Sequence, residues 1–307
     1  MDKTRLLQLL GEWPSKSPLS SAVVDQVDCG DYIRERVEYD TEPGERISAF
    51  VLVPKHKPGR NAPAVFCHHQ HANNFALGKS EVVGLAGDPD QALAVELVRR
   101  GYVVLAPDAL GFEDRNYAAG VIERQWAHRL VAGKTLLAKV LHDVGVGLDY
   151  LQTRIEVGSD RFGFVGHSYG GRMAIWVPTV DDRVVVSISH CGALTYRDSI
   201  SLDHPIQPEF CVPGILSYGD LPDIARLQGA FLYLSSTTDD KWSPSASTIY
   251  EEASQHRDRG SITLRLWPGN HVFTEEMRQA AYDYLDQHLR PEPAKRSLDT
   301  GEPQNRP

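Results

Sequence analysis

The residues with the clearest chemical meaning form the sequence Gly166-His167-Ser168-Tyr169-Gly170, in which a glycine lies two positions away on each side of a serine. A sharp strand-to-helix turn under such a serine brings those two neighbours so close that only small residues fit. The apolar run 162–165 before the turn and the helix-like run 172–177 after it supply this context. The turn would raise the serine Oγ above the edge of a sheet, beside helical N–H groups that favour an oxyanion. We therefore predict that Ser168 is a nucleophile, and the alternative is a glycine-rich turn with a surface serine.

A nucleophilic serine needs a base that takes its proton and an acid that holds the base in one tautomer. Where a strand–turn–helix carries the serine, the acid follows it in the chain and the histidine comes last. His271 follows the expected last strand, 262–266, and precedes the expected last helix. The alternative for His271 is a loop histidine that occurs there by chance. For the acid, Asp240 is the first choice and Asp239 is the second, since both follow the apolar run 231–234.

Attack of a serine on a carbonyl group produces an oxyanion that needs two hydrogen-bond donors. The backbone N–H of Tyr169, directly after the serine, is expected to be one of them. The second is expected from the loop 68–74, which follows the first buried run. We choose the N–H of His71, with that of Ala72 as the next candidate.

The histidines at positions 68, 69 and 71 also raise the question of a metal site. A zinc site requires a further ligand and supporting hydrogen bonds, which the sequence does not place. We therefore predict no metal, and expect one of these histidines to pack under the loop while another contacts the substrate.

Buried strands and helices that alternate along the chain are expected to position these groups. Short apolar runs occur at 64–67, 102–106, 162–165, 184–188 and 231–234, and such runs are typical of parallel strands buried on both faces. Helical patterns lie between them, at 88–100, 136–152, 243–259 and 274–289. Before them, 32–39 and 46–54 alternate between apolar and polar residues, which predicts an antiparallel hairpin at one edge. The fold class is therefore α/β, with a mostly parallel sheet and helices on both faces.

The expected organisation is an N-terminal helical extension at 1–30, a main domain at 31–290 and a flexible tail at 291–307. Two connections, 112–135 and 190–228, are longer than crossovers require, and we expect them to form a small cap over a pocket. Five residues are candidates for the pocket lining: His69, Gln70, Trp126, Tyr196 and Trp242. The alternative for the aromatic residues is that they only pack the inserts against the domain.

Composition excludes several other classes of protein. The chain has 307 residues, of which 41% are hydrophobic and 24% charged, and its net charge is −9. Basic residues do not cluster densely enough for a nucleic acid or a membrane surface, so we expect neither partner. Apolar runs fall short of the roughly 20 residues that span a membrane, and the N-terminal run is too short for a signal peptide. The four scattered cysteines, with no CxxC pair, favour a cytoplasmic protein. The sequence is compatible with either a monomer or a homodimer.

Several stretches together resemble one family. They are Ala62 to Phe66 before the histidine-rich loop, Gly78-Lys79-Ser80-Glu81, the segment 100–112, the serine turn 166–171, the segment 218–227 and Gly269-Asn270-His271. Over residues 45–290 the chain is similar to α/β-hydrolases of the dienelactone-hydrolase-like and acetyl-xylan-esterase-like group. The resemblance implies a triad of Ser168, Asp240 and His271 that cleaves carboxylic esters or lactones without a metal or an organic cofactor.

The chain departs from the family pattern at two places. His69-Gln70 stands where the family has His-Gly, and we expect the Gln70 side chain to enter the space beside the scissile carbonyl. Gln228-Gly229-Ala230 replaces a Pro-Arg-Pro that often precedes the acid-bearing strand. Dienelactone hydrolases proper use a cysteine nucleophile, so the serine here favours an ordinary ester.

Three functions follow from these patterns, with a small-molecule ester as the expected partner. The first is a serine esterase that cleaves a small acyl ester or a lactone. The second is an acyltransferase or thioesterase of a biosynthetic pathway, with the same triad. The third is a non-catalytic protein that uses the fold to bind a ligand, and the complete order of serine, acid and histidine speaks against it.

Overall fold

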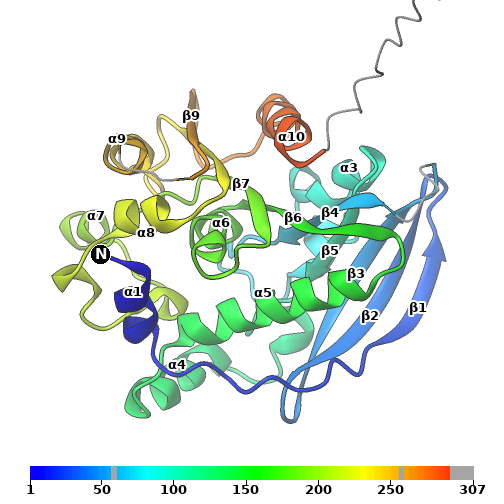
Figure 1. Ribbon diagram of the computed structural model, residues 1–307, viewed down its shortest axis with the longest axis horizontal. Coiled ribbons are helices and arrows are strands. Elements are labelled where there is room, and N and C mark those ends of the chain that lie inside the picture. The colour runs from blue at the N-terminus through cyan, green and yellow to red at the C-terminus, as the bar shows by residue number, and fades with distance from the viewer. Residues whose placement is uncertain (57–60, 256–258, 291–307) are drawn as a thin grey trace, which may run out of the picture.

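The computed structural model describes residues 1–56, 61–255 and 259–290, and within them a nine-stranded sheet forms the centre of the protein (Figure 1). Its order is β1-β2-β3-β5-β4-β6-β7-β8-β9. The strands β4 to β9 pair in parallel, whereas β1, β2 and β3 are antiparallel to their neighbours. The expected α/β fold with a mostly parallel sheet is therefore confirmed. The strands are β1 (Ala22–Asp28), β2 (Tyr32–Glu42), β3 (Glu45–Pro54), β4 (Ala62–His68), β5 (Val103–Pro107), β6 (Val157–His167), β7 (Val184–His190), β8 (Phe231–Thr237) and β9 (Ile262–Trp267).

Helices cover both faces of the sheet. On one face α5, α6 and α9 pack against it, and on the other face α2, α3 and α10 do so (Figure 1). Leu6 and Leu10 of α1 belong to the core on the α5–α6 side. The α-helices are α1 (Lys3–Leu10), α2 (Lys79–Val82), α3 (Leu93–Arg99), α4 (Val121–Val131), α5 (Leu136–Thr153), α6 (Tyr169–Val180), α7 (Tyr196–Ser201), α8 (Leu221–Leu227), α9 (Ala246–Ser254) and α10 (Glu275–Leu289). Short 3₁₀ helices are η1 (Pro89–Gln91), η2 (Glu113–Arg115), η3 (Pro208–Phe210) and η4 (Ile215–Ser217).

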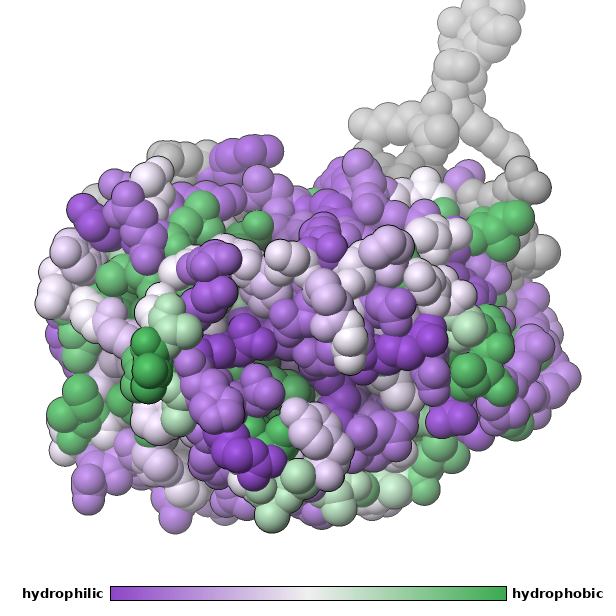
Figure 2. Space-filling view, turned by 90° about the horizontal axis from the view of Figure 1, so that it is seen from below, coloured by the Kyte–Doolittle hydropathy of each residue, from purple (hydrophilic) through white to green (hydrophobic). Residues whose placement is uncertain are grey.

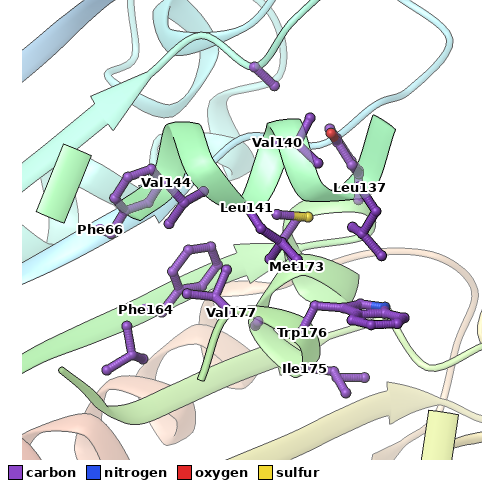
Figure 3. Packing of buried hydrophobic residues seen from close by; sticks show 14 of the residues in the cluster. Phe66, Leu137, Val140, Leu141, Val144, Phe164, Met173, Ile175, Trp176 and Val177 are labelled. Carbon is purple, nitrogen blue, oxygen red and sulfur yellow. The ribbon is translucent and has the colours of Figure 1, made fainter. Parts of the chain in front are cut away.

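The core on the α5–α6 side shows how the sequence directs this packing. Helix α5 begins where the Thr135 side chain accepts a hydrogen bond from the N–H of Ala138, which satisfies one of the unpaired donors of the first turn. Its apolar face meets Met173 and Trp176 of α6 and the stacked rings of Phe66 and Phe164 on the sheet (Figure 3). Each large apolar side chain buried in this way contributes roughly 1.5–3 kcal/mol. Helix α6, which begins directly after Ser168, is thereby held firmly against the sheet.

The N-terminal segment differs from the sequence expectation in one element. Helix α1 forms near the expected place, with Asp2 as its N-cap, but residues 22–28 add the strand β1, which the sequence did not predict. All seven residues of β1 are exposed on the edge of the sheet. Because neither face of the strand is buried, the strand lacks the alternation of apolar and polar residues by which half-buried strands are recognised.

The face in Figure 2 is largely hydrophilic, with apolar groups towards both ends of the molecule.

The two long connections fold into short helices. The insert 112–135 contains η2 and α4, and the insert 190–228 contains α7, η3, η4 and α8. The proposed tail, 291–307, lies outside the described residues. Within the described ranges, the helices are too short or too polar to pass through a bilayer.

Candidate active site

Ser168 lies between β6 and α6 in a strained backbone conformation, with φ of 57° and ψ of −112°. The strain is enforced by contacts around it. A Cβ on Gly166 would lie 2.2 Å from the carbonyl carbon of Gly170, and a Cβ on Gly170 would lie 2.4 Å from the carbonyl oxygen of His68. Backbone hydrogen bonds anchor Ser168 itself, since its N–H donates to the carbonyl of His190 at 2.8 Å. The turn is therefore the sharp, glycine-dependent bend that the pattern predicts.

His271 is paired with Asp240, not with Asp239. The Nδ1 of His271 lies 2.8 Å from Oδ2 of Asp240, while Asp239 is exposed. Asp240 is 4% exposed and also accepts hydrogen bonds from the N–H of Trp242 and the hydroxyl of Ser243. Burial raises the pKa of Asp240, but the hydrogen bonds from His271 and Ser243 outweigh it and hold that pKa below its usual value. Because the carboxylate accepts from Nδ1–H, Nε2 of His271 is left as the basic nitrogen.

Ser168 and His271 line the same cavity, which has a volume of about 500 Å³. Both long inserts contribute to its wall, one through Glu123 and the other through residues 205–208. Trp242 lines it as well, as expected for a pocket residue. The volume lies within the range usual for small-molecule sites, roughly 300–1,000 Å³.

Two backbone segments that line this cavity contain the N–H groups predicted to bind an oxyanion. Tyr169 is the first residue of α6, and the N–H groups of a first helical turn have no partner within the helix. Across from it, His71, Ala72 and Asn73 line the cavity. Ala72 and Asn73 adopt positive φ angles of 46° and 52°, and the Asn73 N–H donates to Nδ1 of His71. Within the described residues, the backbone N–H of His71 has no hydrogen-bond partner.

His69 and Gln70 do not line the cavity in the way the sequence suggested. The His69 ring is 1% exposed, with Nδ1–H donating to the carbonyl of Gln70 and Nε2 accepting from the N–H of Ala109. Burial lowers the pKa of His69 to about 3, which fixes it as neutral. The Gln70 amide donates to the carboxylate of Glu81 and does not project beside Ser168. The hydrogen-bond partner of the Gln70 side chain is therefore Glu81, a buried acid of α2.

Trp126 and Tyr196 line a second cavity, not the one at Ser168. This second cavity has a volume of about 310 Å³, and its wall consists mainly of apolar side chains of α4 and of the 196–217 segment. Ile206 borders both cavities. The Tyr196 hydroxyl donates to the carbonyl of Phe210, so this ring also packs the insert down, as the alternative interpretation held.

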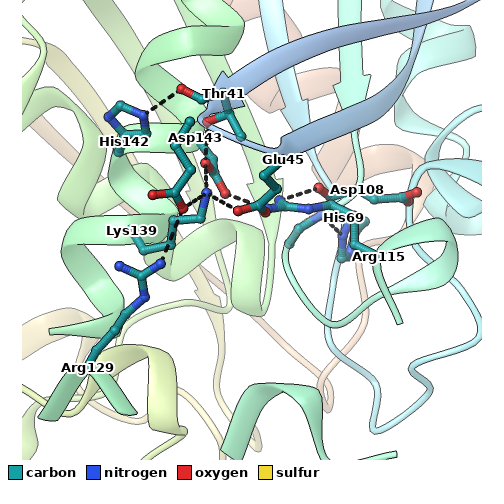
Figure 4. A network of polar contacts seen from close by, with 11 residues as sticks. Thr41, Glu45, His69, Asp108, Arg115, Arg129, Lys139, His142 and Asp143 are labelled. Atoms are coloured by element: carbon teal, nitrogen blue, oxygen red, sulfur yellow. Dashed lines mark hydrogen bonds and ion pairs between the residues drawn. The ribbon is translucent and has the colours of Figure 1, made fainter. Parts of the chain in front are cut away.

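A network of buried charges supports the 68–74 loop from behind (Figure 4). Arg115 donates to Asp143 of α5 at 2.8 Å, to Glu45 of β3 and to the carbonyl of Asp108. Nζ of Lys139 lies 2.7 Å from Oδ1 of Asp143, and the Lys139 side chain is 0% exposed. The carbonyl of Asp108 belongs to the same short segment as Ala109, which hydrogen-bonds to His69. The charges therefore connect the hairpin β2–β3, the helix α5 and the loops after β4 and β5.

Sequence reasoning missed two groups at the cavity. Arg172 lies in the first turn of α6, where its backbone N–H donates to the Ser168 carbonyl, and it lines the same cavity as Ser168. Cys191 follows β7 with a positive φ of 49° and lines the cavity beside Asp240 and His271. Burial raises the pKa of the Cys191 thiol to about 12, so the thiol stays protonated. No local pattern marks this cysteine in the sequence.

Comparison with solved structures identifies the fold. An acetyl xylan esterase from Paenibacillus sp. R4 has 19% identity and a TM-score of 0.66, and the match covers 92% of this chain and 99% of the other. A glucuronoyl esterase from Solibacter usitatus has 16% identity and a TM-score of 0.68, over 92% and 91% of the two chains. At this identity the likeness shows that the architecture is that of an α/β-hydrolase.

Comparison of sequences reaches the family. The Bacillus subtilis protein YtaP, which its name places among the hydrolases, is 33% identical over 197 residues, and the match covers 64% of this chain and 64% of YtaP. The Pseudomonas aeruginosa protein PA2218 is 24% identical over 209 residues, and the matched region spans 46% of its length. The model of the dienelactone hydrolase family matches residues 79–284, which include the serine turn, Asp240 and His271. The chain therefore belongs to the dienelactone hydrolase family.

Proposed function

We propose that this protein is a serine hydrolase that cleaves a carboxylic ester through an acyl-enzyme intermediate. The observation that carries the proposal is the 2.8 Å pair of His271 and Asp240, whose imidazole lines the same cavity as Ser168 on its strained turn. The family and the names of the structural neighbours, which are esterases, favour an ester as the bond that is cleaved. The nucleophile, the base and the acid of a hydrolase would thus come from the ends of β6, β9 and β8.

In the first half-reaction, Oγ of Ser168 forms a bond to the ester carbonyl carbon while Nε2 of His271 takes the hydroxyl proton. The carbonyl oxygen becomes an oxyanion, which the backbone N–H groups of Tyr169 and His71 bind. Donors of this kind contribute roughly 3–4 kcal/mol each to stabilising the transition state. When the tetrahedral intermediate collapses, the bond to the alcohol oxygen breaks, and His271 gives its proton to the leaving alcohol.

In the second half-reaction, water takes the place of the alcohol. His271 accepts a proton from the water as the water oxygen attacks the acyl carbon, and it then returns the proton to Oγ of Ser168 as the acid leaves. Asp240 stays ionised throughout and stabilises the imidazolium that forms twice in each cycle. Its lowered pKa suits that role, because the carboxylate must be charged at the working pH.

The test is a pair of substitutions combined with a covalent probe. We expect Ser168→Ala and His271→Ala to lower kcat for short-chain aryl esters by roughly 10⁴-fold or more, because the nucleophile and its base act as a unit. A fluorophosphonate should label Ser168 in the unaltered protein, and peptide mass spectrometry would locate the adduct. Ser201→Ala, at an exposed serine of α7, is the matched control and should retain full activity. Labelling elsewhere, or turnover by Ser168→Ala within tenfold of the unaltered protein, would refute the proposal.

A further inference from the structure

A cysteine lies beside the histidine–aspartate pair of the candidate active site. Cys191 and His271 line the cavity that contains Ser168, and His271 is hydrogen-bonded to the buried Asp240. One ligand atom of each of Cys191, Asp240 and His271 lies within 4.8 Å of the other two. These atoms are a sulfur, a carboxylate oxygen and an imidazole nitrogen, which are the three kinds of atom that bind Zn²⁺ in proteins. The three residues therefore form a ligand set for a thiophilic divalent cation.

The three ligand atoms need only a small adjustment to hold one ion. Zinc–ligand bonds of about 2.0–2.3 Å place the ligands of a tetrahedral site roughly 3.3–3.8 Å apart. Separations within 4.8 Å thus require side-chain movements of roughly 1 Å. Asp240 and His271 are already in contact at 2.8 Å, so the larger movement falls on Cys191, whose side chain turns about a single bond. The cavity supplies the path by which an ion would reach these side chains.

A buried histidine next to Cys191 has a nitrogen without a partner. His167 is 2% exposed, and its Nδ1 lies 3.1 Å from the acceptor Oε1 of Gln91. Nδ1 therefore carries the proton, and Nε2 carries a lone pair. Within the described residues this Nε2 has no hydrogen-bond partner. His167 also belongs to a second group of possible metal ligands, which includes Cys191. A neutral imidazole with a free lone pair is the form in which histidine binds metal ions.

The third member of that second group, His190, is already engaged within the protein. Its Nε2–H donates to the carbonyl of Val272 at 2.7 Å, and its Nδ1 accepts from the hydroxyl of Ser235 at 2.9 Å. The Cys191 sulfur contacts the hydroxyl of Thr237 only at a long distance, 3.9 Å. The ligands that remain around Cys191 are Asp240, His271 and His167.

We propose that Cys191, Asp240 and His271 bind Zn²⁺ or a similar thiophilic divalent cation, and that the bound ion reversibly inhibits the enzyme. His167 is placed to supply the fourth ligand, because the centre of its ring lies 4.8 Å from that of His271 and it neighbours Cys191. A thiolate selects such an ion over Mg²⁺ and Ca²⁺, which prefer oxygen ligands. The inhibition rests on the proposed ester hydrolysis, whereas the binding of the ion does not.

The bound ion would remove the base on which the hydrolysis depends. The Cys191 thiol gives its proton to water, and its sulfur forms a bond to the metal. If Nδ1 of His271 is the ligand, the ring proton moves from Nδ1 to Nε2. If Nε2 is the ligand, the metal takes its lone pair. In both arrangements one proton is released for each ion bound, no electron is transferred, and His271 can no longer accept the proton of Ser168.

The first test is inhibition of ester hydrolysis by Zn²⁺ in a buffer that does not chelate metals. We expect micromolar Zn²⁺ to inhibit the hydrolysis of a short-chain aryl ester, and EDTA to restore the rate. Mg²⁺ and Ca²⁺ at the same concentrations should leave the rate unchanged, because the thiolate is a poor ligand for them. Full activity in millimolar Zn²⁺ would refute the proposal.

Substitutions at Cys191 should remove the sensitivity to Zn²⁺. Each variant is compared with its own rate without metal, and we expect Cys191→Ala and Cys191→Ser to need at least about 100-fold more Zn²⁺ for half-inhibition. The reason is that loss of even a supporting hydrogen bond lowers metal affinity about 10- to 100-fold. Cys191→Ser keeps a side chain of nearly the same size, so the test survives if the alanine variant does not fold.

Cys211→Ala is the matched control for these substitutions. Cys211 is a partly buried cysteine that lies outside both groups of possible ligands, so its replacement should leave the sensitivity to Zn²⁺ as it is in the unaltered protein. Inhibition of the two Cys191 variants at the same Zn²⁺ concentration as the unaltered protein would overturn the proposal.

Binding of Co²⁺ gives a measurement that does not depend on turnover. A thiolate bound to Co²⁺ produces a charge-transfer absorption band in the near ultraviolet. We expect this band in the unaltered protein and in Ser168→Ala, its displacement by excess Zn²⁺, and its loss in Cys191→Ser. If the band depends on Cys191 while no ester is cleaved, the ester hydrolysis fails and the metal site stands. If no band appears, or if it persists in Cys191→Ser, the metal site is refuted whatever the esters show.

Discussion

Two of the groups of charged side chains inside this protein differ in whether other side chains neutralise them. Behind the 68–74 loop, Arg115 and Lys139 both contact Asp143, at 2.8 and 2.7 Å. At the cavity that contains Ser168, Arg172 has no ion-pair partner among the described residues. Next to the cavity-lining Pro208, neither carboxyl oxygen of Glu209 has a hydrogen bond to another of them.

The difference separates charges that the fold neutralises from charges that it leaves without a partner among the described residues. Attraction in a low-dielectric interior compensates for desolvation only when the charges are paired and hydrogen-bonded. The first group meets that condition, and its contacts tie the β2–β3 hairpin and α5 to the loops that surround the candidate site. The second group does not meet it, so folding alone gives no reason for these charges to be there.

The largest expected effect comes from breaking the paired group. Arg115→Met leaves Asp143 and Glu45 with fewer partners in the interior, although Lys139 still contacts both. We expect the free energy of unfolding at pH 7 to fall by about 3–4 kcal/mol, as for other buried pairs that lose one member. Urea denaturation monitored by circular dichroism measures it. A loss below about 1 kcal/mol would show that the network is not structural.

That prediction has a pH dependence with a definite sign. Arg115 and Lys139 hold the pKa of Asp143 far below its usual value, against the opposing effect of burial. Their stabilisation is therefore present above the unfolded-state pKa of an aspartate, about 4, and declines only as the pH falls below it. The difference in the free energy of unfolding between Arg115→Met and the unaltered protein should accordingly be similar at pH 5 and pH 7. A difference that already vanishes at pH 5 would contradict the assignment.

The next largest effect is a gain in stability, which we expect when Glu209 is replaced. Burial raises its pKa to about 7, so the folded state holds a proton that the unfolded chain releases near pH 4.5. Proton binding by Glu209 therefore favours the folded state at low pH. This contribution to stability is lost as the pH rises from about 4.5 to 7, because the buried carboxyl must then ionise or stay protonated at a cost in free energy. We expect Glu209→Gln to be more stable than the unaltered protein at pH 8 by roughly 2–3 kcal/mol, and nearly equal at pH 4.5. Thermal unfolding at the two pH values measures this, and a gain that is the same at both would refute it.

The smallest effect on stability is expected at Arg172. Arg172→Met removes a guanidinium whose partners among the described residues are one carbonyl at 3.4 Å and one aromatic ring. We expect the free energy of unfolding to change by less than about 1 kcal/mol, in either direction, because little pairing is lost and a desolvation cost is removed. Urea denaturation beside Arg115→Met makes the comparison direct, since the two variants exchange the same residue types. A loss as large as that of Arg115→Met would erase the distinction between the two groups.

Much of the architecture could be predicted because each signal was local. The apolar runs became β4 to β8, and Gly166 reflects its contact with Gly170, four positions further along the chain. His271 and the aspartates could be located because each directly follows a strand whose pattern is clear. The strand β1 escaped prediction because its side chains are exposed, so no burial shaped its sequence.

The lining of the cavity could not be predicted in the same way. Gln70 was expected beside Ser168 but hydrogen-bonds to Glu81, eleven residues further along the chain. Trp126 and Tyr196 were expected at the same pocket and line a neighbouring cavity. In each instance the partner is distant in sequence, and several partners were compatible with the same residue types. The choice depended on which surfaces meet when the inserts fold.

The sequence by itself determined the strand–turn–helix around Ser168, the order of the chemical groups and the alternation of strands and helices, since steric limits and periodic burial act between near neighbours. Only the tertiary structure decided that Asp240 and not Asp239 pairs with His271, and that Arg172 has no counterion among the residues that the structure describes. These outcomes depend on distances between segments that are far apart in the chain, and on burial, which no single segment contains.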